Sequence, residues 1–184
     1  MTTTLKALRT LGSTGPLLAP IGLGLMGMSD LYGPADDAES IATIHRALDA
    51  GVTLLDTGDF YGMGRNELLL RDALRGRRRE DVVISVKFGV LRDAAGGWSG
   101  VDTRPVAIKN FLAYTLRRLG TDHVDIYRPA RIDPTVPMKR PSARWHSSSS
   151  RATSGISDCP RWARAPCAEP TRCTRSPTCR SSTR

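Results

Sequence analysis

Asp56, Tyr61 and Lys87 are the side chains of this sequence whose types and order could carry acid–base chemistry. A phenol alone is a poor acid at neutral pH. A neighbouring ammonium favours the phenolate and so makes the phenol a stronger acid, while a carboxylate paired with the ammonium keeps it charged and in place. Such a trio could protonate a carbonyl oxygen while a hydride arrives at the carbon. An ordinary surface tyrosine and a helix-capping aspartate fit the same spacing, and both interpretations stay open at this point.

These three side chains need a scaffold that brings the ends of several strands together. The sequence alternates between short apolar runs, which predict strands, and amphipathic stretches, which predict helices, and this order is typical of a parallel α/β fold. The predicted strands are 21–26, 52–55, 82–86 and 124–127, and the predicted helices are 36–51, 66–74 and 105–119. Because ligands bind at the carboxyl ends of parallel strands, the three side chains should converge on one edge. Four such strands are half of an eight-unit barrel or most of a small doubly wound sheet.

Local signals fix the ends and faces of these helices. Acidic residues crowd the start of helix 36–51, and Pro105 suits the first turn of the third helix, which Gly120 can end. Leu68, Leu69 and Ala73 are expected to form the buried face of helix 66–74.

Gly22 to Gly27 fit the pattern G-x-G-x-x-G, which is the dinucleotide fingerprint when it joins a strand to a helix. Here the third glycine leads into a loop that ends at Pro34, so no helix begins where a pyrophosphate would need its N-terminus. We therefore reject a Rossmann interpretation and expect a tight strand end.

Five segments of the sequence, taken in order, resemble the aldo-keto reductases. They are Gly22–Ser29 (GLGLMGMS), Leu54–Gly62 (LLDTGDFYG), Gly64–Leu70 (GRNELLL), Val83–Gly89 (VISVKFG) and Leu116–Tyr127 (LRRLGTDHVDIY). The resemblance covers residues 8–137 and implies an α/β (β/α)8 TIM barrel, of which this chain would hold about the first four β/α units. It also implies NADPH as the hydride donor and a small carbonyl compound, an aldehyde or ketone, as the substrate.

The resemblance assigns roles to four residues. Tyr61 is implied as the proton donor, Lys87 as the cation that tunes it, and Asp56 as the residue that holds Lys87. Met26 and Asp56 are implied to line the nicotinamide pocket. One position departs from the family pattern, because Ala130 stands where the family has a catalytic His after the fourth strand.

The chain carries 27 Lys+Arg and 18 Asp+Glu, a formal charge of +9, but the excess is unevenly placed. Residues 141–184 hold 8 basic and 2 acidic residues, together with all four cysteines and no Leu or Val. The cysteine spacing contains no C-x-x-C pair, which argues against a zinc module. This segment holds only two tryptophans, which are too few for a nucleic-acid stacking platform. We expect a disordered, low-complexity basic tail over 138–184, with no metal site and no specific nucleic-acid partner.

The sequence also lacks the marks of membrane or secreted proteins. No apolar run approaches the roughly 18–20 residues of a membrane span, and the first residues do not form a signal peptide. We therefore expect a cytoplasmic protein without a membrane partner.

The change of composition at Met138 suggests a shifted reading frame. Arg, Ser, Pro, Ala, Thr and Cys without Leu or Val are what an out-of-frame reading of a GC-rich gene yields. Codons can be chosen so that a one-base shift at Met138 turns 141–184 into helix, strand and helix. The expectation is that 1–137 is the N-terminal half of a reductase barrel, truncated by a frameshift.

Truncation changes the expected function. Four strands of a barrel leave two edges exposed, through which the chain should associate non-specifically. Such a chain should bind NADPH weakly or not at all. Besides an NADPH-dependent oxidoreductase, the alternatives are a catalytically inactive fragment, a half-barrel that recovers activity by dimerising, and a basic binding protein on a reductase-like scaffold.

Overall fold

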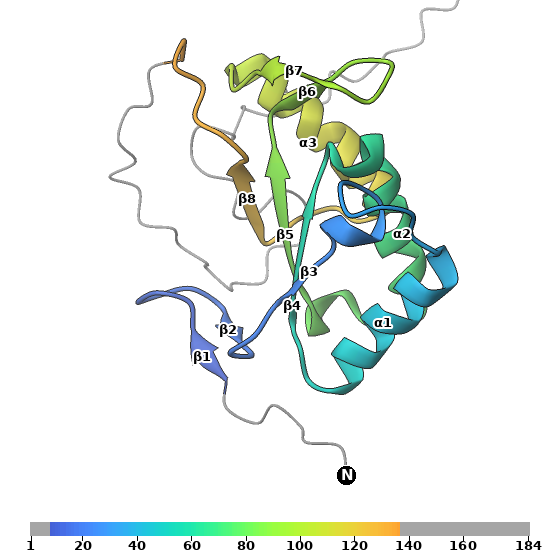
Figure 1. Ribbon diagram of the computed structural model, residues 1–184. Coiled ribbons are helices and arrows are strands. Elements are labelled where there is room, and N and C mark those ends of the chain that lie inside the picture. Colours follow the sequence, from blue (N-terminus) through green and yellow to red (C-terminus); the bar gives the residue numbers. More distant parts are fainter. Residues whose placement is uncertain (1–7, 137–184) are drawn as a thin grey trace, which may run out of the picture.

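The computed structural model describes residues 8–136, in which three α-helices cover one face of a four-stranded parallel sheet (Figure 1). In their order across the sheet, the strands are β3 (Leu23–Gly24), β4 (Leu54–Gly58), β5 (Val83–Phe88) and β8 (Ile126–Pro129). The helices that connect them are α1 (Asp37–Asp49), α2 (Arg65–Ala73) and α3 (Pro105–Leu119). The predicted parallel α/β alternation is confirmed. The predicted tail over 138–184 lies outside the described residues.

Helix ends follow the signals in the sequence. Asp36 caps α1, where its side chain accepts a hydrogen bond from the backbone N–H of Glu39 at 2.8 Å. Pro105 occupies the first turn of α3, and Gly120 ends that helix in the left-handed conformation with φ +69°.

Two hairpins and three short 3₁₀ helices lie outside the main alternation. The hairpins pair β1 (Arg9–Thr10) with β2 (Leu17–Leu18) and β6 (Val90–Arg92) with β7 (Trp98–Val101). The 3₁₀ helices are η1 (Met26–Met28), η2 (Tyr61–Gly64) and η3 (Arg79–Asp81). The sequence analysis missed both hairpins because their strands are only two to four residues long. In the second, Asp93 accepts hydrogen bonds from the N–H groups of Ala95 and Gly97, a turn pattern that the sequence does display.

Strand boundaries differ from the prediction in both directions. The strand expected over 21–26 is reduced to β3, after which the chain turns into η1. The next two strands run further than predicted, because parallel pairing continues to Gly58 opposite Lys87. Asp56 and Lys87 therefore lie within strands and do not close them.

The buried face of α2 also differs from the prediction. Leu69, Leu70 and Ala73 are buried, whereas Leu68 is 38% exposed. The reason is that α2 lies between α1 and α3, so its core-facing stripe centres on Leu70.

The core lies between the sheet and the helices. Strand residues that point toward the helices, such as Leu55, Val86 and Phe88, are fully buried and pack with Ile44 and Leu70. The alternate strand residues face the opposite side, where the side chains of Asp56 and Lys87 stay partly exposed. One face of the sheet is thus apolar and covered, and the other carries polar side chains.

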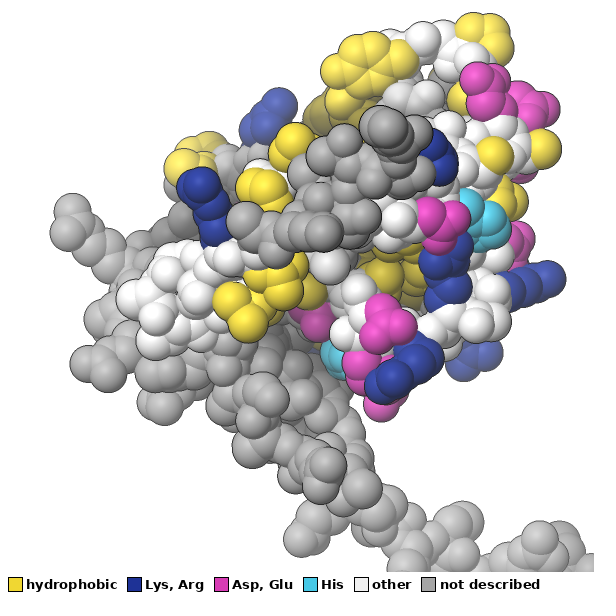
Figure 2. Space-filling model, turned by 90° about the horizontal axis from the view of Figure 1, so that it is seen from below, with side chains coloured by type: hydrophobic (Ala, Val, Ile, Leu, Met, Phe, Trp, Pro, Cys, Tyr) yellow, Lys and Arg dark blue, Asp and Glu magenta, His cyan; other side chains and the backbone are white. Residues whose placement is uncertain are grey.

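The view from below shows acidic and basic side chains mixed together where the described residues are visible (Figure 2). Among the described residues, acidic and basic side chains also form pairs such as Arg77 with Asp49 at 3.0 Å. On this face the described side chains do not form a patch of one charge. Among residues 8–136, none of the helices has the length and apolar character needed to cross a membrane.

The stacked pair of Phe88 and Tyr127 provides a test of this core. Their ring centroids are 4.3 Å apart and Phe88 is fully buried. Phe88→Ala should lower the free energy of unfolding by about 3–5 kcal/mol, because it removes buried surface and leaves a cavity. Tyr114→Ala, at a site 54% exposed, should change it by about 0.5 kcal/mol or less. Urea unfolding followed by circular dichroism measures both, and equal losses would contradict the assigned core.

Candidate active site

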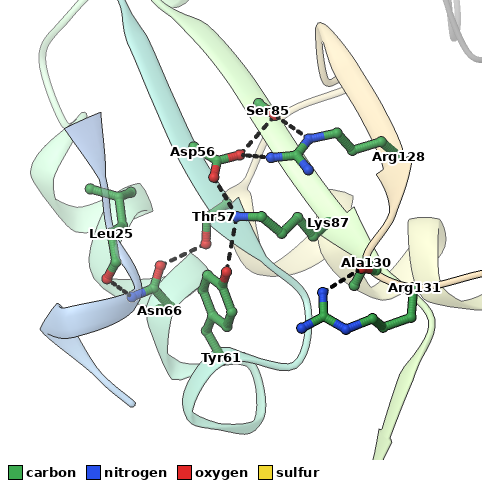
Figure 3. A network of polar contacts seen from close by, with 10 residues as sticks. All are labelled: Leu25, Asp56, Thr57, Tyr61, Asn66, Ser85, Lys87, Arg128, Ala130 and Arg131. Atoms are coloured by element: carbon green, nitrogen blue, oxygen red, sulfur yellow. Dashed lines mark hydrogen bonds and ion pairs between the residues drawn. The ribbon is translucent and has the colours of Figure 1, made fainter. Parts of the chain in front are cut away.

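Asp56, Tyr61 and Lys87 meet on the polar face of the sheet, at the carboxyl ends of β4 and β5 (Figure 3). The Nζ of Lys87 donates a hydrogen bond to the Oη of Tyr61 at 2.9 Å. The same ammonium forms an ion pair with Oδ2 of Asp56. The structure thus brings together the three residues that the sequence analysis singled out.

Strand register explains how two neighbouring strands deliver these groups. Asp56 lies opposite Ser85, and Gly58 lies opposite Lys87, so that the side chains of Asp56 and Lys87 are one pleat apart on the same face. Tyr61 comes from η2, which follows β4 directly. A Cβ on Gly58 would come within 3.1 Å of the Tyr61 ring, so the glycine lets that ring lie close to the strand.

The Asp56 carboxylate has two further partners. Its Oδ1 accepts hydrogen bonds from Ser85 Oγ at 2.9 Å and from Arg128 Nη2 at 2.9 Å. Arg128 belongs to β8, where it lies in register with Lys87. The sequence analysis did not single out Arg128, although its alternation with buried Tyr127 could have placed it on the face that holds Asp56.

A hollow of about 230 Å³ opens beside the trio. Its lining comprises Gly24, Leu25, Met26, Gly27, Tyr32, Asp56, Tyr61 and Lys87. Met26 and Asp56, the two residues predicted for a cofactor pocket, both belong to it. The hydroxyl of Tyr61 therefore lies at the border of a space that a small ring could enter.

Asn66 ties the loop after β3 to β4. Its buried amide nitrogen donates to the carbonyl oxygen of Leu25 at 2.8 Å and to Ser29 Oγ at 2.7 Å. Its amide oxygen accepts a hydrogen bond from Thr57 Oγ1 at 2.6 Å. The sequence analysis missed Asn66, which shapes one wall of the hollow without touching the trio.

A buried cluster of charged groups supports the turn that carries Tyr61. Glu67 is fully buried in α2 and pairs with Arg118 from the end of α3. The Nη2 of Arg118 also reaches the carbonyl oxygen of Asp59 at 3.4 Å. Gly64 leaves room for this guanidinium, since a Cβ there would lie 2.8 Å from Arg118.

Burial shifts the acidity of both carboxyl groups in this cluster. It raises the pKa of Asp59 from 3.8 to about 8, and the negative charge of Glu67 adds to the rise while Arg118 opposes it. Burial also raises the pKa of Glu67, against the opposing effects of Arg118 and Thr115. The native structure therefore favours the protonated form of Asp59 at neutral pH.

No histidine stands beside Tyr61 in the part of the chain that the structure describes. Ala130 follows β8 and packs with Phe60, Tyr61 and Val90. His45 bonds instead to the carbonyl oxygen of Ala73 at 2.7 Å.

A comparison with protein families identifies the fold. The model of the aldo/keto reductase family matches residues 20–158. The chain belongs to this family of reductases. The match begins and ends later than the resemblance over 8–137 that the sequence analysis described.

Solved structures of other reductases share this architecture. An aldo-keto reductase from Bacillus halodurans, in its holo form, is 32% identical with a TM-score of 0.58, over 66% of this chain and 39% of its own. A putative aldo-keto reductase from Pseudomonas aeruginosa is 32% identical with a TM-score of 0.60, over 68% of this chain and 48% of its own. The glycerol dehydrogenase from Gluconobacter oxydans is 25% identical with a TM-score of 0.61, over 71% and 41%.

The chain thus spans less than half of the length of these aldo-keto reductases. Its four parallel strands with their three helices form part of the family barrel. The prediction of a partial barrel is confirmed over the described residues.

The raised pKa of Asp59 predicts how the stability of this reductase chain depends on pH. The native state holds a proton that the unfolded chain releases near pH 3.8, so stability falls as the pH rises from about 4 to about 8. The slope for this group reaches up to about 1.4 kcal/mol per pH unit. Asp59→Asn should remove the part of the slope that Asp59 contributes, so the variant gains stability relative to the parent chain as pH rises.

Urea unfolding at several pH values between 5 and 8 measures this difference. Glu80→Gln is the matched control, because this carboxylate in η3 is 73% exposed and its removal should leave the slope in place. A parent chain whose stability rises over this range, with no change in Asp59→Asn, would refute the assignment.

Proposed function

We propose that this site reduces small aldehydes or ketones with NADPH as the hydride donor, with Tyr61 as the proton donor. The contact of 2.9 Å between Tyr61 Oη and Lys87 Nζ is the observation that carries the proposal. It supplies an acid whose conjugate base is stabilised by a neighbouring positive charge. Membership of the reductase family supports the same reaction class.

Tyr61, Lys87 and Asp56 have different roles in the proposed proton transfer. The carbonyl oxygen of the substrate takes the proton of the Tyr61 hydroxyl, and the ammonium of Lys87 stabilises the phenolate that remains. Asp56 keeps Lys87 charged and aimed at Tyr61. A reduced nicotinamide, when bound, supplies the hydride to the carbonyl carbon.

The hollow beside Tyr61 fits the nicotinamide end of such a cofactor. At about 230 Å³ it is smaller than the pockets that hold drug-sized ligands, which span about 300–1,000 Å³. It therefore suits a ring but not a whole dinucleotide. Met26 and Asp56 would hold the ring next to Tyr61.

The 184-residue chain by itself should bind NADPH weakly or not at all, because this hollow offers a place only for the ring. Both outer strands of the sheet, β3 and β8, also present edges that no strand covers among the described residues. We expect these edges to promote non-specific association. Light scattering combined with an NADPH titration tests both expectations. Tight binding together with cofactor-dependent carbonyl reduction by the chain alone would overturn them.

A chimeric barrel tests the reaction itself. Residues 1–136 would be fused to the second half of the barrel from the Pseudomonas aeruginosa reductase, and reduction of an aromatic aldehyde would be followed by NADPH absorbance. Tyr61→Phe in this chimera should lower kcat/KM by about 10²–10⁴-fold, because the proton donor is lost. Lys87→Met should also lower it, because the phenolate loses its stabilising charge.

Tyr114→Phe is the matched control, since it removes a hydroxyl from an exposed site on α3. It should leave kcat/KM unchanged. A chimera that folds and works equally well with the substitution Tyr61→Phe would rule out Tyr61 as the proton donor.

We further propose that the residues from Met138 onward are read out of frame. Their composition supports this, whereas the family match through residue 158 weighs against it for the first part of the segment. The DNA sequence of the gene tests the proposal. Reductase coding in the shifted frame is expected, and its absence would refute the frameshift.

A further inference from the structure

Two positive side chains share one carboxylate in this site. Lys87 pairs with Oδ2 of Asp56, and Arg128 donates from Nη2 to Oδ1 at 2.9 Å (Figure 3). Among the described residues, neither Lys87 nor Arg128 forms an ion pair with any other acid. The three side chains therefore leave one positive charge uncompensated.

The position of Arg128 is fixed on two sides. Its Nε lies 3.4 Å from Ser85 Oγ, while Ser85 donates its own hydrogen bond to Asp56. Register places Arg128 next to Lys87 on the neighbouring strand. The guanidinium thus lies along the side of Asp56 that Lys87 leaves free. Arg128 is absent from the lining of the hollow, so it acts on Tyr61 through charge and not through contact.

We infer that Arg128 is a positioning residue of this site: by neutralising Asp56, it frees the charge of Lys87 to stabilise the phenolate of Tyr61. The inference rests on the proposed role of Tyr61 as proton donor and deepens it. With Asp56 and Lys87 alone, the two charges would cancel at a distance. With Arg128, the site keeps a net positive charge. A positive charge nearby favours the ionised form of the tyrosine, the phenolate.

Other charged groups surround Tyr61 without altering this comparison. Asp30, which accepts a hydrogen bond from the N–H of Gly62, is itself paired with Arg92 from β6. Asp59 precedes Tyr61 by two residues, and its pKa is raised to about 8. Arg131 follows β8 and donates to the carbonyl oxygen of Ala130. All of these groups are the same in variants that differ only at Arg128.

The test is a pH titration of the 184-residue chain with ¹³C-labelled tyrosine, because a ring carbon resonance reports phenolate formation without any turnover. Arg128→Gln should raise the pH of half-ionisation of Tyr61 by up to about 1 unit, because a nearby positive charge that favours the phenolate is removed. Arg128→Lys, which keeps the charge, should recover most of the shift. The resonance of Tyr61 is assigned from Tyr61→Phe.

Two controls separate charge from structure. Arg117→Gln removes the same charge from an exposed position on α3 and should leave the Tyr61 titration unchanged. The resonance of buried Tyr127 reports whether the chain stays folded. An unshifted Tyr61 in folded Arg128→Gln overturns the inference, as does unfolding of both Arg128→Gln and the second neutral variant Arg128→Met.

The titration and the activity of the chimera test the two proposals separately. If the Tyr61 shift appears while the Tyr61→Phe chimera remains fully active, the proposed function fails and the electrostatic role of Arg128 stands. If the chimera needs Tyr61 but the shift is absent, the role of Arg128 fails alone.

Discussion

The carboxylate of Asp56 is the point on which the polar face of the sheet depends. Its two oxygens receive Lys87 and Ser85 from β5 and Arg128 from β8, so a single group on β4 connects three strands. Each bond requires the parallel register that pairs Asp56 with Ser85 and Lys87 with Arg128. A slip of one residue would turn these side chains toward the helices, where Leu55 and Val86 now pack. The register that forms the core therefore also forms the site.

Tyr61 depends on a second constraint, because it lies on a turn and not on a strand. The backbone of that turn is left-handed at Gly62, Met63 and Gly64, a conformation that an isolated chain would seldom keep. Arg118 from α3 pairs with Glu67 and donates to the carbonyl oxygen of Asp59. Asp30 accepts a hydrogen bond from the backbone N–H of Gly62 in the turn. Buried ion pairs of this kind contribute little net stability but are costly to break. Here the pairing fixes where the phenol lies.

Particular residues show which features of the fold and of the site could be predicted from the sequence. The capping Asp36, Pro105 and Gly120 are local signals, and the helix ends follow them. Asp56, Tyr61 and Lys87 could be grouped because parallel strands end on one edge. The face of Arg128 could be predicted from its alternation with Tyr127. Its pairing with Asp56, and that of Arg118 with Glu67, could not, since partners so far apart in sequence leave no local pattern. The prediction that Leu68 is buried was wrong for a related reason, because the packing of α2 between α1 and α3 decides which of its faces is buried.

The exposure of the polar face determines how strongly water screens the charges of the site. The side chains of Asp56 and Lys87 are 24% and 21% exposed and that of Arg128 is 42% exposed, so water screens all three charges. Covering this face with further strands of a barrel would remove water, and a lower local dielectric strengthens each charge interaction. An uncompensated cation would then cost more to bury, unless an anion formed beside it. A phenolate at Tyr61 is such an anion. A lower local dielectric would thus strengthen the interaction of these three charges with a phenolate at Tyr61.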